Sequence, residues 1–284
     1  MKNNIVISAA LGYNKEQLSN FINSLRINFS SRVHLFISET NDFELLKFLE
    51  INNISFTLIA DADNAAVNRY FYLQQYLLNI DINQINEIFW TDSRDVYFQQ
   101  DPFIINLKDN IEYYAEPELI INCPVNSKWI LHLYGDSFYD KIKNKLIICS
   151  GTTRGKASFF INYVNSMCTE ILRLRSFNIL VQGGHDQAVH NYLIHNNLVS
   201  GVIIQNGTST LQTIHYQKTL IFNRDGFLLN TDNKICPVIH QYDRIYMKFK
   251  PFNSKLRVPN NIICRNSNFV DFSKKVRSYF NIQL

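Results

Sequence analysis

Short apolar runs alternate with amphipathic segments through the first hundred residues of the chain. The apolar runs predict strands at residues 5–10, 33–38, 55–60 and 88–91, the last of these being the end of its strand. The segments between them predict helices at residues 15–28, 43–52 and 65–79, with Asp42 as the N-cap of the second. Regular strand–helix alternation implies a mostly parallel sheet with helices on both faces, so we expect an α/β fold.

Ligands of such sheets bind beyond the carboxyl ends of the strands. Three loops are expected at that edge, at residues 10–14, 61–64 and 92–95. The second half is less regular, with a strand at 146–149, helices at 156–174 and 186–196, and short strands after them. Because no repeat or linker-like stretch interrupts the chain, we expect a single domain.

The composition is that of an ordinary folded protein, with 46% hydrophobic and 18% charged residues in 284. The five cysteines are odd in number and widely spaced, which indicates reduced thiols and a cytoplasmic location. The apolar run at residues 5–11 is at the short limit for a signal peptide and leads directly into a helix, so we interpret it as a core strand. The sequence contains no run of about 18 apolar residues, so no transmembrane helix is expected.

The positive charge is concentrated at the C-terminal end. The net charge of the chain is +4, but residues 244–284 hold nine Lys and Arg against one Asp. Such a segment is either a solvated tail or a surface attracted to phosphate groups or to anionic lipid, which would place the protein at the inner face of a membrane. It contains no recognised nucleic-acid-binding motif, so no nucleic-acid partner is expected.

The most informative segment is residues 88–103, Ile-Phe-Trp-Thr-Asp-Ser-Arg-Asp-Val-Tyr-Phe-Gln-Gln-Asp-Pro-Phe. An apolar strand ends here in two carboxylates, Asp92 and Asp95. Two negative charges at one sheet edge are costly unless a cation lies opposite them. Carboxylate oxygens suit Mg²⁺ or Mn²⁺, and either ion can bridge a diphosphate. The alternative to a metal site is a purely structural one, in which the two acids are capping residues neutralised by Arg94.

This segment resembles glycosyltransferases of the GT-A fold, which is Rossmann-like. Residues 95–103 match, without a gap, their pattern Asp-x-Asp-Val-x-(Trp/Phe)-x-x-Asp-Pro-(Phe/Leu) when Asp95 is its second, metal-binding Asp. The first Asp of the pattern then falls on Ser93, and Asp92 lies one position early, which leaves its role open. Arg94 is expected either to contact phosphate or to neutralise the two acids.

Further matches run in the same order over nearly the whole chain. Cys149, Ser150 and Gly151 resemble the turn that ends a strand where the donor sugar packs against backbone; the alternative is an ordinary turn. Asp186 and Gln187 open a helix and match a pair that binds sugar hydroxyls or stabilises a developing oxocarbenium ion. The alternative for Asp186 is a helix N-cap.

The resemblance also implies a metal and nucleotide site. His240 falls where these enzymes complete a metal site with a late histidine, so the implied ligands are Asp95, His240 and Asp92. Arg244 and Lys248 are expected near the diphosphate. Arg69 is expected at the base or phosphate, or else on a solvated helix face. The residues expected beneath the base are Ala10, Gly12 and Tyr13.

The resemblance implies a metal-dependent glycosyltransferase of polysaccharide biosynthesis that uses Mn²⁺ or Mg²⁺ and a UDP- or GDP-sugar. The acceptor is expected to be a glycan or a lipid-linked saccharide, and the reaction to retain anomeric configuration, although Asp186 could serve as the base of an inverting enzyme. One alternative is a non-catalytic nucleotide- or glycan-binding module. Another is a sugar nucleotidyltransferase, but residues 9–14 are not its Gly-rich phosphate loop.

Within a single domain, the expected parts are a nucleotide-binding half at residues 1–103, a donor-sugar and acceptor half at 104–243, and the basic C-terminal segment at 244–284.

Overall fold

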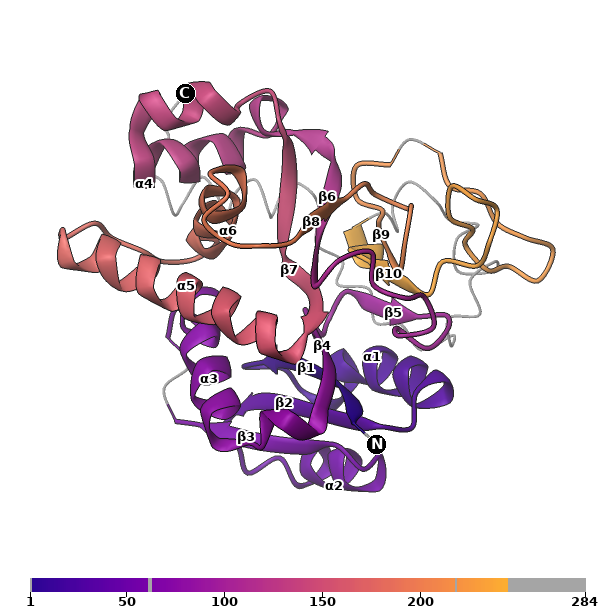
Figure 1. Ribbon diagram of the computed structural model, residues 1–284. Helices are drawn as coiled ribbons and strands as arrows, with labels where there is room; N and C mark the ends of the chain where they lie inside the picture. Colours follow the sequence, from indigo (N-terminus) through magenta and orange to yellow (C-terminus); the bar gives the residue numbers. More distant parts are fainter. Residues whose placement is uncertain (1, 61–62, 218, 245–284) are drawn as a thin grey trace, which may run out of the picture.

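The computed structural model describes residues 2–60, 63–217 and 219–244. Lys248 and nearly all of the basic C-terminal segment lie outside these residues, as do Asp61 and Ala62 of the second predicted loop. The described chain forms an α/β structure around a seven-stranded mixed sheet (Figure 1).

The strand order of the main sheet is β3-β2-β1-β4-β7-β6-β8. These strands are β1 (Asn3–Ala10), β2 (Arg32–Ser38), β3 (Ser55–Ile59), β4 (Ile85–Thr91), β6 (Ile111–Leu119), β7 (Leu146–Lys156) and β8 (Val202–Ile204). The first four strands pair in parallel, β7 is antiparallel to both of its neighbours, and β8 is parallel to β6. The expectation of a mostly parallel sheet is therefore confirmed.

Six α-helices lie on the two faces of the sheet (Figure 1). They are α1 (Lys15–Asn28), α2 (Phe43–Ile51), α3 (Ala65–Asn79), α4 (Pro124–Ile142), α5 (Ala157–Ser176) and α6 (His185–His195). Short 3₁₀ helices occur at Ile82–Gln84, Ile120–Asn122 and Tyr242–Arg244. Among these, α1 and α3 have the predicted bounds, α1 begins with an Asn14–Gln17 capping box, and Asp42 caps α2 as predicted.

Alternate residues of the central strands feed two separate cores. Ile5 and Ile7 of β1 pack on the side of α3 to α6, whereas Val6 packs on the side of α1 and α2. In β4, Trp90 belongs to the first core and Phe89 to the second. Period-two burial on both faces is what a sheet between two helical layers requires.

A second, three-stranded sheet stands beside the main one, with the order β5-β10-β9. Its strands are β5 (Val96–Phe98), β9 (Leu211–Thr213) and β10 (Val238–His240). β5 begins directly after the 92–95 loop, and its pairing places His240 opposite Val96. This long-range pairing brings the late histidine to the acidic loop.

One expectation for the second half is wrong, and one of the alternatives is excluded. Strand β7 does not end at Cys149 but runs to Lys156, so Ser150 and Gly151 lie within the strand. Its polar continuation is buried because Arg154 donates to Glu87 at 2.5 and 3.0 Å and to Thr210 at 2.8 Å. Helix α6 begins at His185 and its N-cap is Gly184, so Asp186 is not the cap.

The cysteines of the described residues, Cys123, Cys149, Cys168 and Cys236, are free and buried. Cys264 lies outside the described residues. None of the helices placed by the structure is long and apolar enough to cross a membrane.

Asn191 fastens α6 to β7. The side chain is fully buried, accepts from the backbone N–H of Ile148 at 2.9 Å and donates to its carbonyl at 2.8 Å. We expect Asn191→Ala to lower the free energy of unfolding by about 3 kcal/mol, because two buried backbone groups lose their partner. Denaturant unfolding measures this loss. The control Asn196→Ala, on the exposed end of the same helix, should change it by about 0.5 kcal/mol or less; equal effects would contradict the assignment.

His190 makes stability depend on pH. Burial lowers the pKa of this histidine from 6.5 to about 3. As the pH falls below 6.5, the unfolded chain takes up a proton here that the folded protein does not, so stability is lost between pH 6.5 and about pH 3. In His190→Leu, the slope of unfolding free energy against pH should decrease by about 1.4 kcal/mol per pH unit within this window. Parallel curves for variant and wild type would contradict this.

Candidate active site

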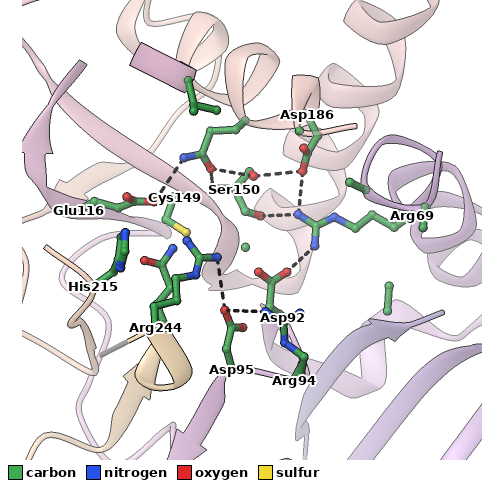
Figure 2. Close-up of a pocket in the computed structure, with 18 of the residues that line it drawn as sticks. Arg69, Asp92, Arg94, Asp95, Glu116, Cys149, Ser150, Asp186, His215 and Arg244 are labelled. Atoms are coloured by element: carbon green, nitrogen blue, oxygen red, sulfur yellow. Dashed lines mark hydrogen bonds and ion pairs between the residues drawn. The ribbon is translucent and has the colours of Figure 1, made fainter. Parts of the chain in front are cut away.

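A pocket of about 450 Å³ opens at the carboxyl ends of β1 and β4. Figure 2 shows Asp92 and Asp95 at its floor, Arg69 on one side and Glu116 with His215 on the other. Of the predicted site residues, Tyr13, Arg69, Ser93, Arg94, Ser150, Gly151, Gln187, Asp92, Asp95, Asp186 and Arg244 all line it. The structure therefore brings residues from both halves of the chain to one place.

Asp92, Asp95 and His240 form a group that could hold a metal ion, with one ligand atom from each within 4.8 Å of the others. Nε2 of His240 lies 3.6 Å from Asp92 Oδ2 and 3.7 Å from Asp95 Oδ1. These distances are too long for hydrogen bonds, and this buried nitrogen has no hydrogen-bond partner among the described residues. Two carboxylate oxygens and one imidazole nitrogen facing a common point are a donor set suited to Mn²⁺ or Mg²⁺.

The other ring nitrogen of His240 is already engaged. Nδ1 lies 3.4 Å from Oγ1 of Thr213 and 3.7 Å from Sγ of Cys149. Contacts at Nδ1 orient the ring and leave Nε2 directed at the carboxylates, as outer-shell partners of metal-binding histidines do. His240 is fully buried beneath the pocket floor.

The electrostatics of the group favour a cation. Burial would lower the pKa of His240, but Cys149 and the carboxylates of Asp95 and Asp92 raise it well above its ordinary value. Burial would likewise raise the pKa of Asp92, but the Arg69 guanidinium and His240 outweigh it and lower that pKa. A metal ion would compete with the His240 proton for the same two carboxylates, so its binding would release a proton.

Arg69 connects Asp92 of the acidic loop to Asp186 of helix α6. Its guanidinium donates to Asp92 Oδ1 at 2.5 Å and to Asp186 Oδ2 at 2.7 Å. The side chain is buried, so the solvated helix face considered for Arg69 is wrong. Its charge is taken up by two carboxylates, which makes it a positioning residue of the site.

Asp186 and Gln187 converge on Ser150. Ser150 Oγ lies 3.0 Å from Asp186 Oδ2 and 3.0 Å from Gln187 Oε1, and the backbone N–H of Ser150 donates to the same Gln187 oxygen at 2.9 Å. Burial raises the pKa of Asp186, against the opposing effect of Arg69. The first turn of α6 is thus fixed to β7 by side chains rather than by a capping hydrogen bond.

Gly151 makes room for Asp92. A Cβ at position 151 would overlap the Asp92 carboxylate, and the Asp92 backbone N–H donates to the Gly151 carbonyl at 2.7 Å. The group that approaches this glycine is therefore the acidic loop, and the approach of a donor sugar stays a prediction.

The remaining cations near the floor are paired with acids. Arg94 lies 3.1 Å from Asp243 and 3.9 Å from Asp95. Of the two acids that it was expected to neutralise, Asp95 has this contact, whereas Asp92 pairs with Arg69. Arg244 contacts Asp95 Oδ2 at 3.4 Å and is exposed at the pocket. Ser93 donates from Oγ to the carbonyl of Ala9 at 3.2 Å and ties the loop to β1.

The prediction for the base-binding residues needs two corrections. Ala10 is buried in the core between β1 and α1, and Ala9 and Leu11 line the pocket instead, because neighbouring residues of a strand face opposite sides. Gly12 is also not among the lining residues; at φ +73°, it donates its N–H to Ser38 Oγ at 2.9 Å and supports the turn. Tyr13 does line the pocket.

Sequence reasoning missed several lining residues: Glu116 of β6, Asn126 and Trp129 of α4, and His215 and Tyr216 after β9. The sequence held no clear signal for them: Glu116 is one of three glutamates in β6, and only the structure shows which of these are buried. A buried acid needs a partner or a ligand.

Comparison with known proteins gives no family: no protein-family model matches the sequence, and no curated protein matches it.

Gly151→Ala tests the packing of the acidic loop. The added methyl group should displace the Asp92 carboxylate and weaken Mn²⁺ binding by about tenfold or more, the usual effect of losing outer-shell support. Isothermal titration calorimetry with Mn²⁺ measures the change. The control Gly155→Ala, in the same strand, places a Cβ 2.8 Å from Ile111 and should lower thermal stability without weakening Mn²⁺ binding. Unaltered Mn²⁺ affinity in Gly151→Ala would show that Asp92 does not contribute to the site.

Proposed function

We propose that the chain is a divalent-metal-dependent glycosyltransferase of the GT-A type, which transfers a sugar from a UDP- or GDP-sugar to an acceptor hydroxyl. The observation that carries the proposal is the convergence of Asp92, Asp95 and His240 at the carboxyl end of β4, on the floor of a pocket. A metal-ligand group at the ligand edge of a mostly parallel sheet is the arrangement a nucleotide-diphosphate donor needs.

Asp92, Asp95 and His240 are the residues that would hold the cation. When bound, the cation would supply Lewis-acid stabilisation of the charge that develops on the departing nucleoside diphosphate. Arg244 is exposed at the pocket beside Asp95 and is positioned to contact phosphate oxygens. Tyr13 offers a ring for the base, and the small side chains of Ala65 and Ala66 line the same pocket.

The donor sugar is assigned to the first turn of α6. Gln187 and Asp186 lie there with Ser150, and these groups can exchange hydrogen bonds with sugar hydroxyls. Arg69 holds Asp186 and Asp92 at fixed positions relative to each other, so donor sugar and diphosphate would be oriented together.

Retention of configuration is part of the proposal. Asp186 is bound through Oδ2 by both Arg69 and Ser150. These contacts favour a fixed positioning carboxylate over a general base that deprotonates the acceptor. The cytoplasmic location and the association of residues 244–284 with anionic membrane stay predictions from the sequence.

The proposal is tested with a panel of UDP- and GDP-sugars in the presence of Mn²⁺. We expect at least one donor to raise the melting temperature, because a ligand of the folded state stabilises it, and to be hydrolysed slowly when no acceptor is present. Binding without turnover would indicate a nucleotide-binding module, and no binding of any donor would contradict the proposal.

Replacing a metal ligand should weaken Mn²⁺ binding and lower the turnover of the donor. We expect Asp95→Asn and His240→Ala to cut turnover by about 10²–10³-fold, because a preorganised contact to developing charge is lost. High Mn²⁺ should restore part of this loss by mass action. The control Asp136→Asn removes an exposed charge on α4, away from the pocket lining. It should leave the turnover and its Mn²⁺ dependence unchanged. An unchanged Mn²⁺ midpoint in His240→Ala would remove that residue from the site.

A further inference from the structure

One wall of the pocket takes no part in the metal site. It is formed by Glu116, Asn126, Trp129, His215 and Tyr216, and is called here the Trp129 wall. In Figure 2 the two labelled members, Glu116 and His215, lie on the left, whereas Arg69 lies on the right. The wall joins β6, the first turns of α4 and the loop after β9.

Trp129 is fixed beside the residues assigned to the donor sugar. A Cβ at position 184 would overlap its six-membered ring, so Gly184 allows the indole to pack on the backbone where α6 begins. Asp186 and Gln187 follow in the first turn of that helix. The indole is only partly buried and contributes to the pocket lining.

Three other members of the wall are held by contacts to Cys123 and to α6. Cys123 lies 3.2 Å from Nδ2 of Asn126 and 3.4 Å from the hydroxyl of Tyr216. Asn126 and Trp129 are three residues apart on α4, which places them on one face of the helix. Gln187 donates to Glu116 Oε1 at 3.3 Å and connects the wall to the donor-sugar residues.

The Trp129 wall differs from the metal side in the charges of its own side chains. None of its five members is Lys or Arg; the arginines of the described pocket lining are Arg69, Arg94 and Arg244, and each contacts an acid of the metal side. Arg244 also lies near enough to Glu116 for their charges to interact. Glu116 itself is nearly buried, with an exposed fraction of 3%. A phosphate brought to this wall would meet a carboxylate, and like charges brought together in this way are unfavourable.

Aromatic rings combined with an amide and a carboxylate match a neutral polyol. A pyranose has an apolar C–H face that can pack on an indole, and hydroxyls that can donate to a carboxylate and bond to an amide. Pockets lined by aromatic side chains with a few placed polar groups are typical of small-molecule sites.

We propose that the Trp129 wall binds a neutral saccharide, with the indole against its C–H face and Glu116 and Asn126 at its hydroxyls. The assignment of this saccharide as the acceptor, instead of a phosphate-bearing lipid head group, rests on the proposed function. Saccharide binding at this wall does not depend on the proposed function.

The chain contains two tryptophans, of which Trp90 is fully buried, so Trp129 reports on the pocket by fluorescence. The full-length chain is titrated, in Mn²⁺ with UDP or with GDP, against methyl glycosides of glucose, galactose, mannose and N-acetylglucosamine. Glucose 6-phosphate and mannose 6-phosphate serve as anionic probes. We expect at least one methyl glycoside to change the emission saturably and to shield the indole from acrylamide, with weaker effects from the sugar phosphates. Trp129→Phe should abolish the emission change.

Binding is measured in parallel by saturation-transfer NMR, which needs no tryptophan. Trp129→Ala should weaken glycoside binding by about tenfold or more, as loss of a buried aromatic anchor does, and Glu116→Gln should narrow the preference for neutral sugars over sugar phosphates. Trp129→Phe keeps an aromatic ring, so intermediate binding in that variant shows that the loss in Trp129→Ala is not a folding defect.

The proposal is overturned if no methyl glycoside binds, if Trp129→Ala binds as tightly as wild type, or if sugar phosphates bind better than neutral sugars. Nucleotide-sugar hydrolysis without glycoside binding would overturn this proposal alone. Glycoside binding at Trp129 without any binding or hydrolysis of nucleotide sugars would overturn only the proposed function.

Discussion

The ion pairs that Arg69 makes with Asp92 and Asp186 hold the candidate site together. This one guanidinium links α3 to the loop after β4 and to the first turn of α6. Removing one partner of a buried ion pair typically costs about 3–5 kcal/mol, since the other charge stays buried and unpaired. Asp92 and Asp186 are therefore positioned by the same residue.

The second constraint is the pairing of β5 with β10. It places His240 opposite Val96, and the backbone N–H of Gln241 donates to the carbonyl of Asp95 at 2.7 Å. The pairing register of these two strands therefore places His240 beside the acidic loop, although the two are far apart in the sequence. Gly151 completes the arrangement by leaving space for the Asp92 carboxylate against β7. Three separate long-range contacts thus converge on a group whose free ligand atoms face one point.

Sequence predicted the first half of the fold well because its periodicity is local: α1 and α3 have the expected bounds and Asp42 is the expected cap. The end of strand β7 is missed because its polar residues resemble a loop; the ion pair with Glu87 and the hydrogen bond to Thr210 satisfy the buried Arg154. Resemblance of motifs pointed to Asp92, Asp95, Asp186 and His240. It could not identify Glu116 or Trp129, whose positions depend on tertiary packing of β6 and α4.

We propose that Asp92, Asp95 and His240 hold a divalent cation that contacts the diphosphate of a donor. Pulsed electron paramagnetic resonance of the Mn²⁺-loaded protein can detect both contacts, because nitrogen and phosphorus nuclei bound to Mn²⁺ give distinct couplings. We expect a nitrogen coupling that disappears in His240→Ala, and a phosphorus coupling that appears when UDP or GDP is added to the wild type. Bound Mn²⁺ that shows no histidine nitrogen, or no phosphorus with either nucleotide, would contradict it.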